Sequence, residues 1–288
     1  MLVEEVEIGN AKLTCYVQPN SDEMANGPRP AVLVLPGGAF LFTSDREAEP
    51  VALAFSAQGC QTFVLRYTVG DPKGGTAAFP DCENEVAYAV AFIRDHAELW
   101  NIDAGRVFVC GFSAGAQLSL IYATRWRQIA ERLGLAPESA RVNGSITGYA
   151  LSDYFARIAE TDTPAISEKS AVLSREATKA IFGPDAYGEG LPSDEAVRAV
   201  SPAFNVTPDT PPAFLWHTAE DSLVGVYHSL KYAEALAAAR VPFELHVFEK
   251  GPHGLSLADE QTRGSRDEVN ADAAQWLGLA VKWIRREH

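Results

Sequence analysis

The sequence predicts an α/β protein with a mostly parallel central sheet flanked by helices on both faces. Short apolar runs suit strands that are covered on both faces, helical patterns lie between these runs, and the two kinds of segment alternate along the chain. The 288 residues are 47% hydrophobic and 22% charged, so the chain can bury a full core. Because α/β chains of this length often fold as one unit, we expect a single domain over residues 1–288.

Each element follows from its local pattern. Apolar and polar residues alternate from Val3 to Ile8 and from Lys12 to Val17, on either side of Gly9-Asn10, which predicts an antiparallel hairpin. The buried strands expected after it are Ala31–Leu35, Gln61–Leu65, Arg106–Cys110, Ile146–Leu151, Ala213–Trp216 and Glu244–Phe248. Apolar residues at helical spacing predict helices over Val86–Ala97, Leu118–Tyr122, Val226–Leu236 and Val269–Ile284.

Residues 152–210 depart from this rhythm. Prolines, among them Pro184, Pro192 and Pro202, separate short helical pieces in this segment. We expect a cap-like excursion between two strands, above the carboxyl ends of the sheet where ligands bind in such folds. An ordinary long connection with no part in the site is the alternative.

Charge and cysteine usage exclude several classes of partner. The formal net charge is −14 with no compensating basic run, so we expect no nucleic acid and no anionic membrane surface as partner. The first residues lack a basic segment followed by an apolar run, which favours a cytoplasmic protein. The four cysteines are scattered singly, and we expect them to be reduced and to form no zinc site. The sequence does not fix the oligomeric state, and a homo-oligomer is possible.

The strongest chemical signal is Gly111-Phe-Ser113-Ala-Gly115, which directly follows an apolar run and directly precedes a helical pattern. This is the context of a G-x-S-x-G motif, in which a sharp strand-to-helix turn exposes the serine hydroxyl. The flanking glycines leave room for neighbouring backbone, and the start of the helix favours a developing negative charge. We therefore expect Ser113 to be a nucleophile.

A serine near neutral pH needs a base, and the base needs an acid that orients it. His253 stands in a Gly/Pro turn after the last strand, whereas the other histidines lie in helices or strands or at the end of the chain: His96, His217, His228, His246 and His288. Asp221 follows a strand and completes the chain order Ser, Asp, His. Glu220 beside it and Asp153 after an earlier strand are alternative acids, and Asp221 could instead cap the next helix.

A glycine pair follows the first buried strand, in Pro36-Gly-Gly-Ala-Phe40. Such a loop can turn backbone N–H groups towards an oxyanion. We expect the donors to be Gly38 and Ala39, joined by Ala114 after the serine. A plain turn is the alternative, and a phosphate-binding loop is disfavoured because no G-x-x-x-x-G-K-[ST] motif follows.

This loop and the residues Ser113, Asp221 and His253 together resemble the motifs of a known family. The family is the α/β-hydrolase fold esterases related to hormone-sensitive lipase, especially small bacterial acetyl esterases acting on acetylated xylo-oligosaccharides. The resemblance covers most of the chain and includes Leu65-Arg-Tyr67 and Asn101-Ile-Asp103. It implies ester hydrolysis without a metal or organic cofactor. Three positions depart from the family: Pro36 replaces a histidine, Ala39 replaces a third glycine, and Ala116 stands where another glycine is common.

The predicted function is hydrolysis of short-acyl carboxylic esters, on small-molecule substrates such as acetylated sugars or xylo-oligosaccharides. Amide or formamide hydrolysis on the same scaffold is the first alternative. A ligand-binding protein that kept the fold and lost turnover is the second, because a fold does not dictate a function.

Overall fold

A computed structural model describes residues 1–24, 27–161, 163, 167–186 and 190–286. Within this part of the chain, one eight-stranded sheet has the order β1-β2-β4-β3-β5-β6-β7-β8. The strands are β1 (Leu2–Ile8), β2 (Ala11–Val17), β3 (Arg29–Leu35), β4 (Gln61–Arg66), β5 (Ile102–Phe112), β6 (Gly144–Gly148), β7 (Ala213–Thr218) and β8 (Phe243–Phe248). β1 and β2 form the predicted antiparallel hairpin, β2 pairs antiparallel with β4, and all other pairs are parallel.

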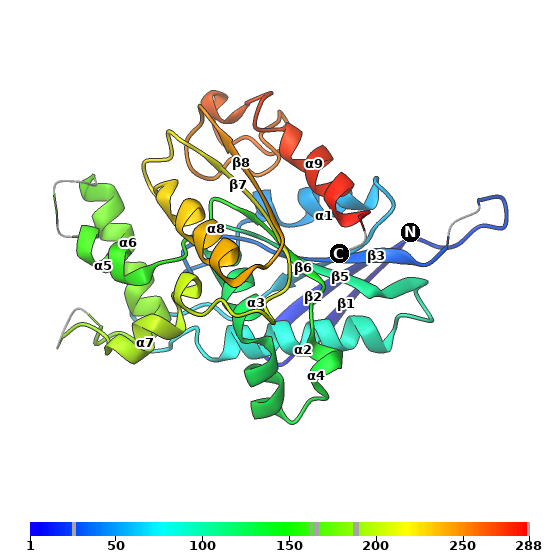
Figure 1. Ribbon diagram of the computed structural model, residues 1–288, viewed down its shortest axis with the longest axis horizontal. Coiled ribbons are helices and arrows are strands. Elements are labelled where there is room, and N and C mark those ends of the chain that lie inside the picture. The colour runs from blue at the N-terminus through cyan, green and yellow to red at the C-terminus, as the bar shows by residue number, and fades with distance from the viewer. Residues whose placement is uncertain (25–26, 162, 164–166, 187–189, 287–288) are drawn as a thin grey trace.

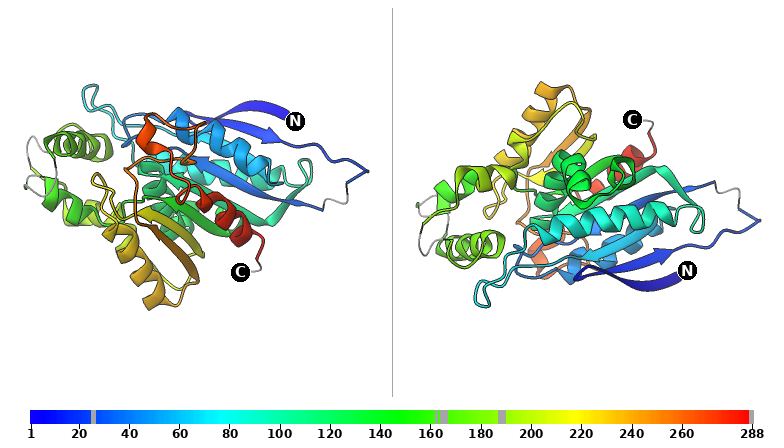
Figure 2. Two further views of the ribbon diagram at one scale, coloured as in Figure 1. Left: turned by 90° about the horizontal axis from the view of Figure 1, so that it is seen from above. Right: turned by 90° about the horizontal axis from the view of Figure 1, so that it is seen from below.

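Helices cover both faces of this sheet, as the views from above and from below show (Figure 2). One face carries α1 (Glu49–Ser56) and α9 (Gln275–Ile284); the other carries α2 (Asp81–Asp95), α3 (Ala114–Leu133), α4 (Pro137–Ala140) and α8 (Tyr227–Ala239). The predicted mostly parallel α/β architecture is therefore confirmed.

The apolar runs are buried on both faces because successive strand residues point to opposite sides. Leu33 of β3 belongs to the core beneath α2 and α3, whereas Val32 and Val34 belong to the core beneath α1 and α9. All three side chains are fully buried. The central strands therefore need apolar residues at consecutive positions, which is why their sequences do not alternate.

Several predicted boundaries were wrong by a few residues. The last helix begins at Gln275 and not at Val269, because the Asn270 side chain accepts hydrogen bonds from the Asp272 and Ala273 N–H groups (3.1 and 3.0 Å) and holds a turn there. β6 ends at Gly148 and not at Leu151, since Tyr149 turns to φ 43°. α2 ends at Asp95, so Ala97 lies beyond it.

The segment between β6 and β7 contains α5 (Tyr154–Thr161), α6 (Glu168–Phe182), α7 (Asp194–Ala199) and the short turn η2 (Pro202–Phe204). Two further short turns are η1 (Asp45–Glu47) and η3 (Arg266–Glu268). Helices α5, α6 and α7 lie together at the end of the molecule away from both termini (Figure 1). Among the described residues, no helix has the length and apolar character to cross a membrane. Pro164 and His288 lie outside the described residues.

Candidate active site

Ser113 occupies the turn between β5 and α3, where the sequence predicts a nucleophile. Its backbone is strained, with φ 51° and ψ −117°, a combination that non-glycine residues rarely adopt. A Cβ on Gly111 would lie 2.2 Å from the Gly115 carbonyl oxygen, and one on Gly115 would lie 2.0 Å from the Leu35 carbonyl oxygen. Only glycine fits at these two positions, so the motif permits close packing of the turn against α3 and β3.

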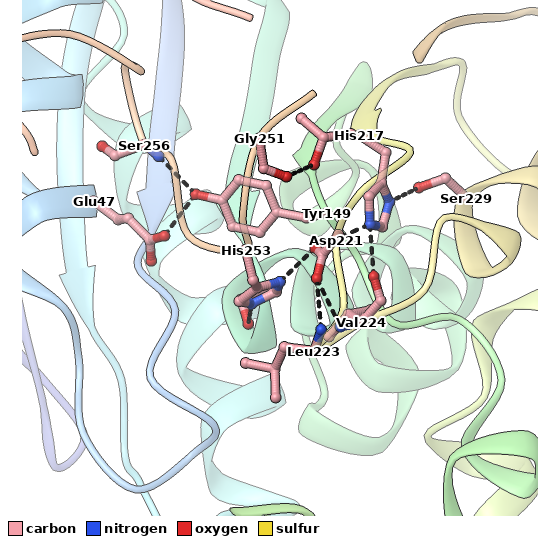
Figure 3. Close-up of polar contacts among 12 residues, drawn as sticks. Glu47, Tyr149, His217, Asp221, Leu223, Val224, Ser229, Gly251, His253 and Ser256 are labelled. Atoms are coloured by element: carbon pink, nitrogen blue, oxygen red, sulfur yellow. Dashed lines mark hydrogen bonds and ion pairs between the residues drawn. The ribbon is translucent and has the colours of Figure 1, made fainter. Parts of the chain in front are cut away.

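The structure brings the three predicted side chains into one hydrogen-bonded chain. His253 Nε2 lies 2.8 Å from Ser113 Oγ, and His253 Nδ1 lies 2.7 Å from Asp221 Oδ2. The link from His253 to Asp221 is drawn in Figure 3. These residues follow β5, β7 and β8, whose carboxyl ends meet at the same edge of the sheet. Parallel pairing therefore brings together groups that are up to 140 residues apart in sequence.

Asp221 is held in an ionised, oriented state by its surroundings. Its Oδ1 accepts hydrogen bonds from the Leu223 and Val224 N–H groups, both at 2.9 Å. Burial favours a higher pKa for this carboxyl, but the facing His253 and the hydrogen bonds from His217, His253 and Val224 outweigh burial and hold the pKa below its usual value. A permanent carboxylate suits the orientation and stabilisation of an imidazolium.

His217 is a member of this site that sequence reasoning missed. Its ring is fully buried, and its Nε2 lies 3.2 Å from Asp221 Oδ2 and 2.9 Å from the Val224 carbonyl oxygen. Because a carbonyl can only accept, Nε2 carries the proton and donates, while Nδ1 faces Ser229 Oγ at 2.8 Å. His217 therefore helps to orient Asp221, because it contacts the same carboxylate oxygen that His253 contacts. The only sequence signal was a histidine on a buried strand four residues before the acid.

The loop after β3 approaches Ser113 from the other side. Gly38 has φ 134°, and a Cβ there would lie 2.0 Å from the Phe42 carbonyl oxygen. Tyr67 Oη donates a 2.6 Å hydrogen bond to the Pro36 carbonyl, which gives the Leu65-Arg-Tyr67 segment a role in holding the loop. Within the described residues, the N–H groups of Ala39 and Ala114 have no hydrogen-bond partner, as oxyanion donors require.

A buried network that the sequence did not predict ties this loop to the histidine loop. Glu47 Oε2 accepts the Gly37 N–H (2.8 Å), and Tyr149 Oη donates to Glu47 Oε1 (2.6 Å). Tyr149 Oη in turn accepts the Ser256 N–H at 2.9 Å (Figure 3). The Tyr149 ring also meets the His253 ring edge to face, with centroids 4.9 Å apart.

Burial raises the pKa of Glu47, although hydrogen bonds from Tyr149 and Gly37 and the facing His253 act in the opposite direction. No local sequence pattern indicates this residue, because one partner lies 10 positions before it and the other 102 positions after it.

A small pocket opens beside the serine, with a volume of about 50 Å³. Ala39 and Ala114 line it together with Ser113, while Gly38 does not. The rest of the lining is mostly apolar. Six of its residues come from the segment between β6 and β7, namely Leu151, Tyr154, Arg157, Leu173, Ala177 and Ile181, and the others are Phe40, Gln117, Leu223 and Val224. The excursion therefore supplies one wall of the pocket.

A protein-family model matches residues 18–236 of this chain. The chain belongs to the BD-FAE family. It is 30% identical to endo-1,4-beta-xylanase B of Butyrivibrio fibrisolvens over 81% of its own length, and 24% identical to an acetylxylan esterase of Xylanibacter ruminicola over 93%. The chain spans only 33% and 48% of these two relatives. The crystal structure of the carboxylesterase Cest-2923 from Lactobacillus plantarum matches with a TM-score of 0.81 and 27% identity, covering 99% of this chain and 97% of the other.

The other acids considered in this BD-FAE chain have different partners. Glu220 is exposed, and its Oε2 accepts the Gly251 N–H at 3.2 Å. Asp153 forms an ion pair with Lys231 and accepts the Ala156 N–H at the start of α5. Of the three candidate acids, Asp221 is the one that reaches His253.

The remaining described histidines do not reach Ser113. His96 stacks on Trp100 with ring centroids 4.5 Å apart, His246 pairs with Glu244, and His228 is buried at the start of α8. Within the described residues, no group of three or more His, Cys, Asp or Glu side chains is placed to hold a metal ion.

The structure shows where two of the residues that depart from the family pattern, Ala39 and Ala116, lie. Ala39 adopts φ 56°, a left-handed conformation that a glycine would adopt with less strain. Ala116 packs in the core beneath α8 with Leu120 and Tyr232 and does not line the pocket. Gln117 lines the pocket instead, and its Nε2 donates to the Val200 carbonyl at 2.8 Å, which ties α3 to the excursion.

Proposed function

We propose that this chain is a serine hydrolase that cleaves carboxylic esters of short acyl groups, with acetyl esters of sugars or xylo-oligosaccharides as the substrate class. The observation that carries the proposal is the continuous chain from Asp221 through His253 to Ser113, with links of 2.7 and 2.8 Å. Membership of the BD-FAE family and the likeness to a carboxylesterase of matching length support it.

In the proposed mechanism, Ser113 Oγ attacks the ester carbonyl while His253 Nε2 accepts its proton. Asp221 holds the imidazole in the required tautomer and stabilises its positive form. Ala39 and Ala114, and by our prediction Gly38, donate backbone N–H groups to the oxyanion, each worth about 3 to 4 kcal/mol when well placed. His253 then protonates the departing alcohol, and water repeats the sequence on the acyl-enzyme.

Pocket size supports the preference for short acyl groups. A volume of about 50 Å³ beside Ser113 is small, which favours a short acyl group over a long one. The name of the Xylanibacter relative supports acetylated xylan fragments as the class to test.

Glycosidic cleavage, which the name of the Butyrivibrio relative raises, needs two carboxyl groups flanking the bond. The described lining of this pocket contains no carboxylate.

The test compares wild type with Ser113→Ala on acetylated xylo-oligosaccharides, simple acetyl esters and longer acyl esters, with products identified. We expect acetyl release by wild type and its loss in the variant. Undiminished hydrolysis by Ser113→Ala would overturn the assignment of the nucleophile. Matched amide and formamide substrates test the alternative chemistry, and failure of the folded protein to react with a covalent serine probe would favour a binding protein.

A further inference from the structure

One charged side chain lies in the wall of the otherwise mostly apolar pocket. Arg157 is on the inner side of α5, is only 6% exposed, and lines the pocket together with Ser113. Ala39 and Ala114, the expected oxyanion donors, line the same pocket. The guanidinium therefore belongs to a residue that a bound ester would approach.

This arginine has no acidic partner in the part of the chain that the structure describes. Its Nη1 donates a 2.7 Å hydrogen bond to the Leu223 carbonyl oxygen, and its other two nitrogens have no hydrogen-bond partner among the described residues. No carboxylate of the described residues lies within 4.0 Å of it, whereas the buried carboxylates of Glu83 and Asp153 each have a basic partner. Asp153, four residues before Arg157, forms an ion pair with Lys231 instead. A buried arginine is rarely left without an anion, because removing it from water is costly.

The effect of this charge extends to a neighbouring residue. The pKa of buried His228 is lowered to about 3, first by burial and next by the positive charge of Arg157, while Asp153 acts in the opposite direction. The charge of Arg157 is therefore felt by a neighbouring buried ring.

We propose that Arg157 forms an anion subsite, and that the preferred esters carry a carboxylate which its free guanidinium nitrogens bind. This proposal rests on the function proposed above and specifies its substrate class. Arginine suits the role because its planar fork can hold a carboxylate through two parallel hydrogen bonds. The carboxylate can belong to the acyl group, as in a dicarboxylic half-ester, or to the alcohol, as in an acetylated sugar acid. The chemistry at Arg157 is the same in both cases.

A purely structural role for Arg157 predicts a different result. The bond to Leu223 connects α5 to the loop that carries Asp221, so its loss could disturb the catalytic acid and slow every substrate equally. An anion subsite instead changes the ratio between charged and neutral substrates. The ratio of kcat/KM values therefore separates the two roles.

The experiment uses two pairs of matched esters. Monomethyl succinate against methyl butyrate tests a carboxylate on the acyl side, and 4-acetoxybenzoate against 4-methylphenyl acetate tests one on the alcohol side. Wild type should prefer the charged member of at least one pair. Arg157→Met should lower that preference about tenfold or more, as loss of a charge-assisted hydrogen-bond pair implies, and Arg157→Lys should retain part of it. Leu173→Met, a change in the same pocket without change of charge, should leave the preference intact.

Three results are decisive. A wild-type enzyme that hydrolyses the neutral esters but prefers neither charged ester overturns the subsite and leaves the proposed function standing. Equal losses on both members of a pair in Arg157→Met also overturn it, in favour of the structural role. Failure of wild type on all four esters counts against the proposed function itself. Thermal unfolding checks that each variant folds. If Arg157→Met does not fold, the preference of the wild-type enzyme still tests the proposal.

Discussion

Glu47→Gln is the substitution that best tests how the loop over residues 36–40, the proposed oxyanion loop, is held. Glu47 accepts one hydrogen bond from Gly37 and another from Tyr149, and its side chain is almost wholly buried. A glutamine has one acceptor oxygen in place of two, so one of these donors loses its partner. An unsatisfied buried donor costs about 1 to 3 kcal/mol, and we expect a loss of unfolding free energy in that range.

The same substitution should lower kcat about tenfold with little change in KM, because the loop loosens without losing a donor to the oxyanion. Removal of such a donor outright typically costs about 10²- to 10³-fold, which sets the upper limit. Initial rates on a short acetyl ester measure this, and urea unfolding measures stability. Glu49→Gln is the matched control, since Glu49 is half-buried and pairs with Arg66 outside the loop. If Glu47→Gln is destabilised but keeps its wild-type kcat, Glu47 is structural only and our reasoning is refuted.

The Glu47 network also predicts a pH effect of known sign. Burial raises the pKa of Glu47 above its ordinary value of 4.5, so the folded state holds this proton more tightly than the unfolded chain does. The stability that depends on this residue is present below the unfolded pKa and is lost as pH rises through the folded pKa. Since glutamine does not titrate, the stability advantage of wild type over Glu47→Gln should shrink as pH rises above the ordinary pKa of 4.5. An advantage that grows with pH would contradict the raised pKa.

Three further predictions concern the triad and the loop. Asp221→Asn should reduce kcat by about 10⁴-fold because the amide favours the wrong imidazole tautomer, whereas Glu220→Gln should retain most activity; similar losses in both would contradict the choice of acid. The pKa of Asp221 is lowered from 3.8, so its contribution to stability is present above that value and is lost only as pH falls below it. Urea unfolding should therefore show a difference in unfolding free energy between wild type and Asp221→Asn that does not change with pH above about pH 5. Ala39→Gly should raise the unfolding free energy by about 0.5 to 1 kcal/mol by relieving the left-handed φ of 56°; thermal unfolding measures this, and a loss of stability would show that the alanine side chain contributes more by packing than it costs in strain.

Sequence predicted those parts of the molecule that depend on local pattern. The buried strands were recognisable because both their faces are covered, and the Ser113 turn because only glycine fits beside it. The sequence favoured Asp221 chiefly through the chain order Ser, Asp, His and left Glu220 as an alternative; in the structure, Asp221 contacts His253 and Glu220 contacts the Gly251 N–H. The boundary errors have local causes that a periodicity ignores, such as the side chain of Asn270 that delays the last helix.

The supporting residues could not be predicted in this way. Tyr149, Glu47 and Ser256 come from three distant segments, and each is an ordinary residue in its own neighbourhood. His217 looked like one more histidine on a buried strand, since its role depends on a ring that faces Asp221 across a turn. Such roles arise from side-chain direction and from contacts between segments, which neither composition nor periodicity encodes.

Tyr149 explains why the two halves of the site should act as a unit. Its hydroxyl contacts Glu47, which holds the oxyanion loop, and the Ser256 N–H, three residues after the base, while its ring contacts His253 itself. Movement of either loop therefore requires a change at one buried side chain. Oxyanion stabilisation depends on donors that are in place before charge develops, and proton transfer depends on a base at hydrogen-bond distance. A single buried tyrosine that contacts both loops gives the protein a way to meet these two requirements together.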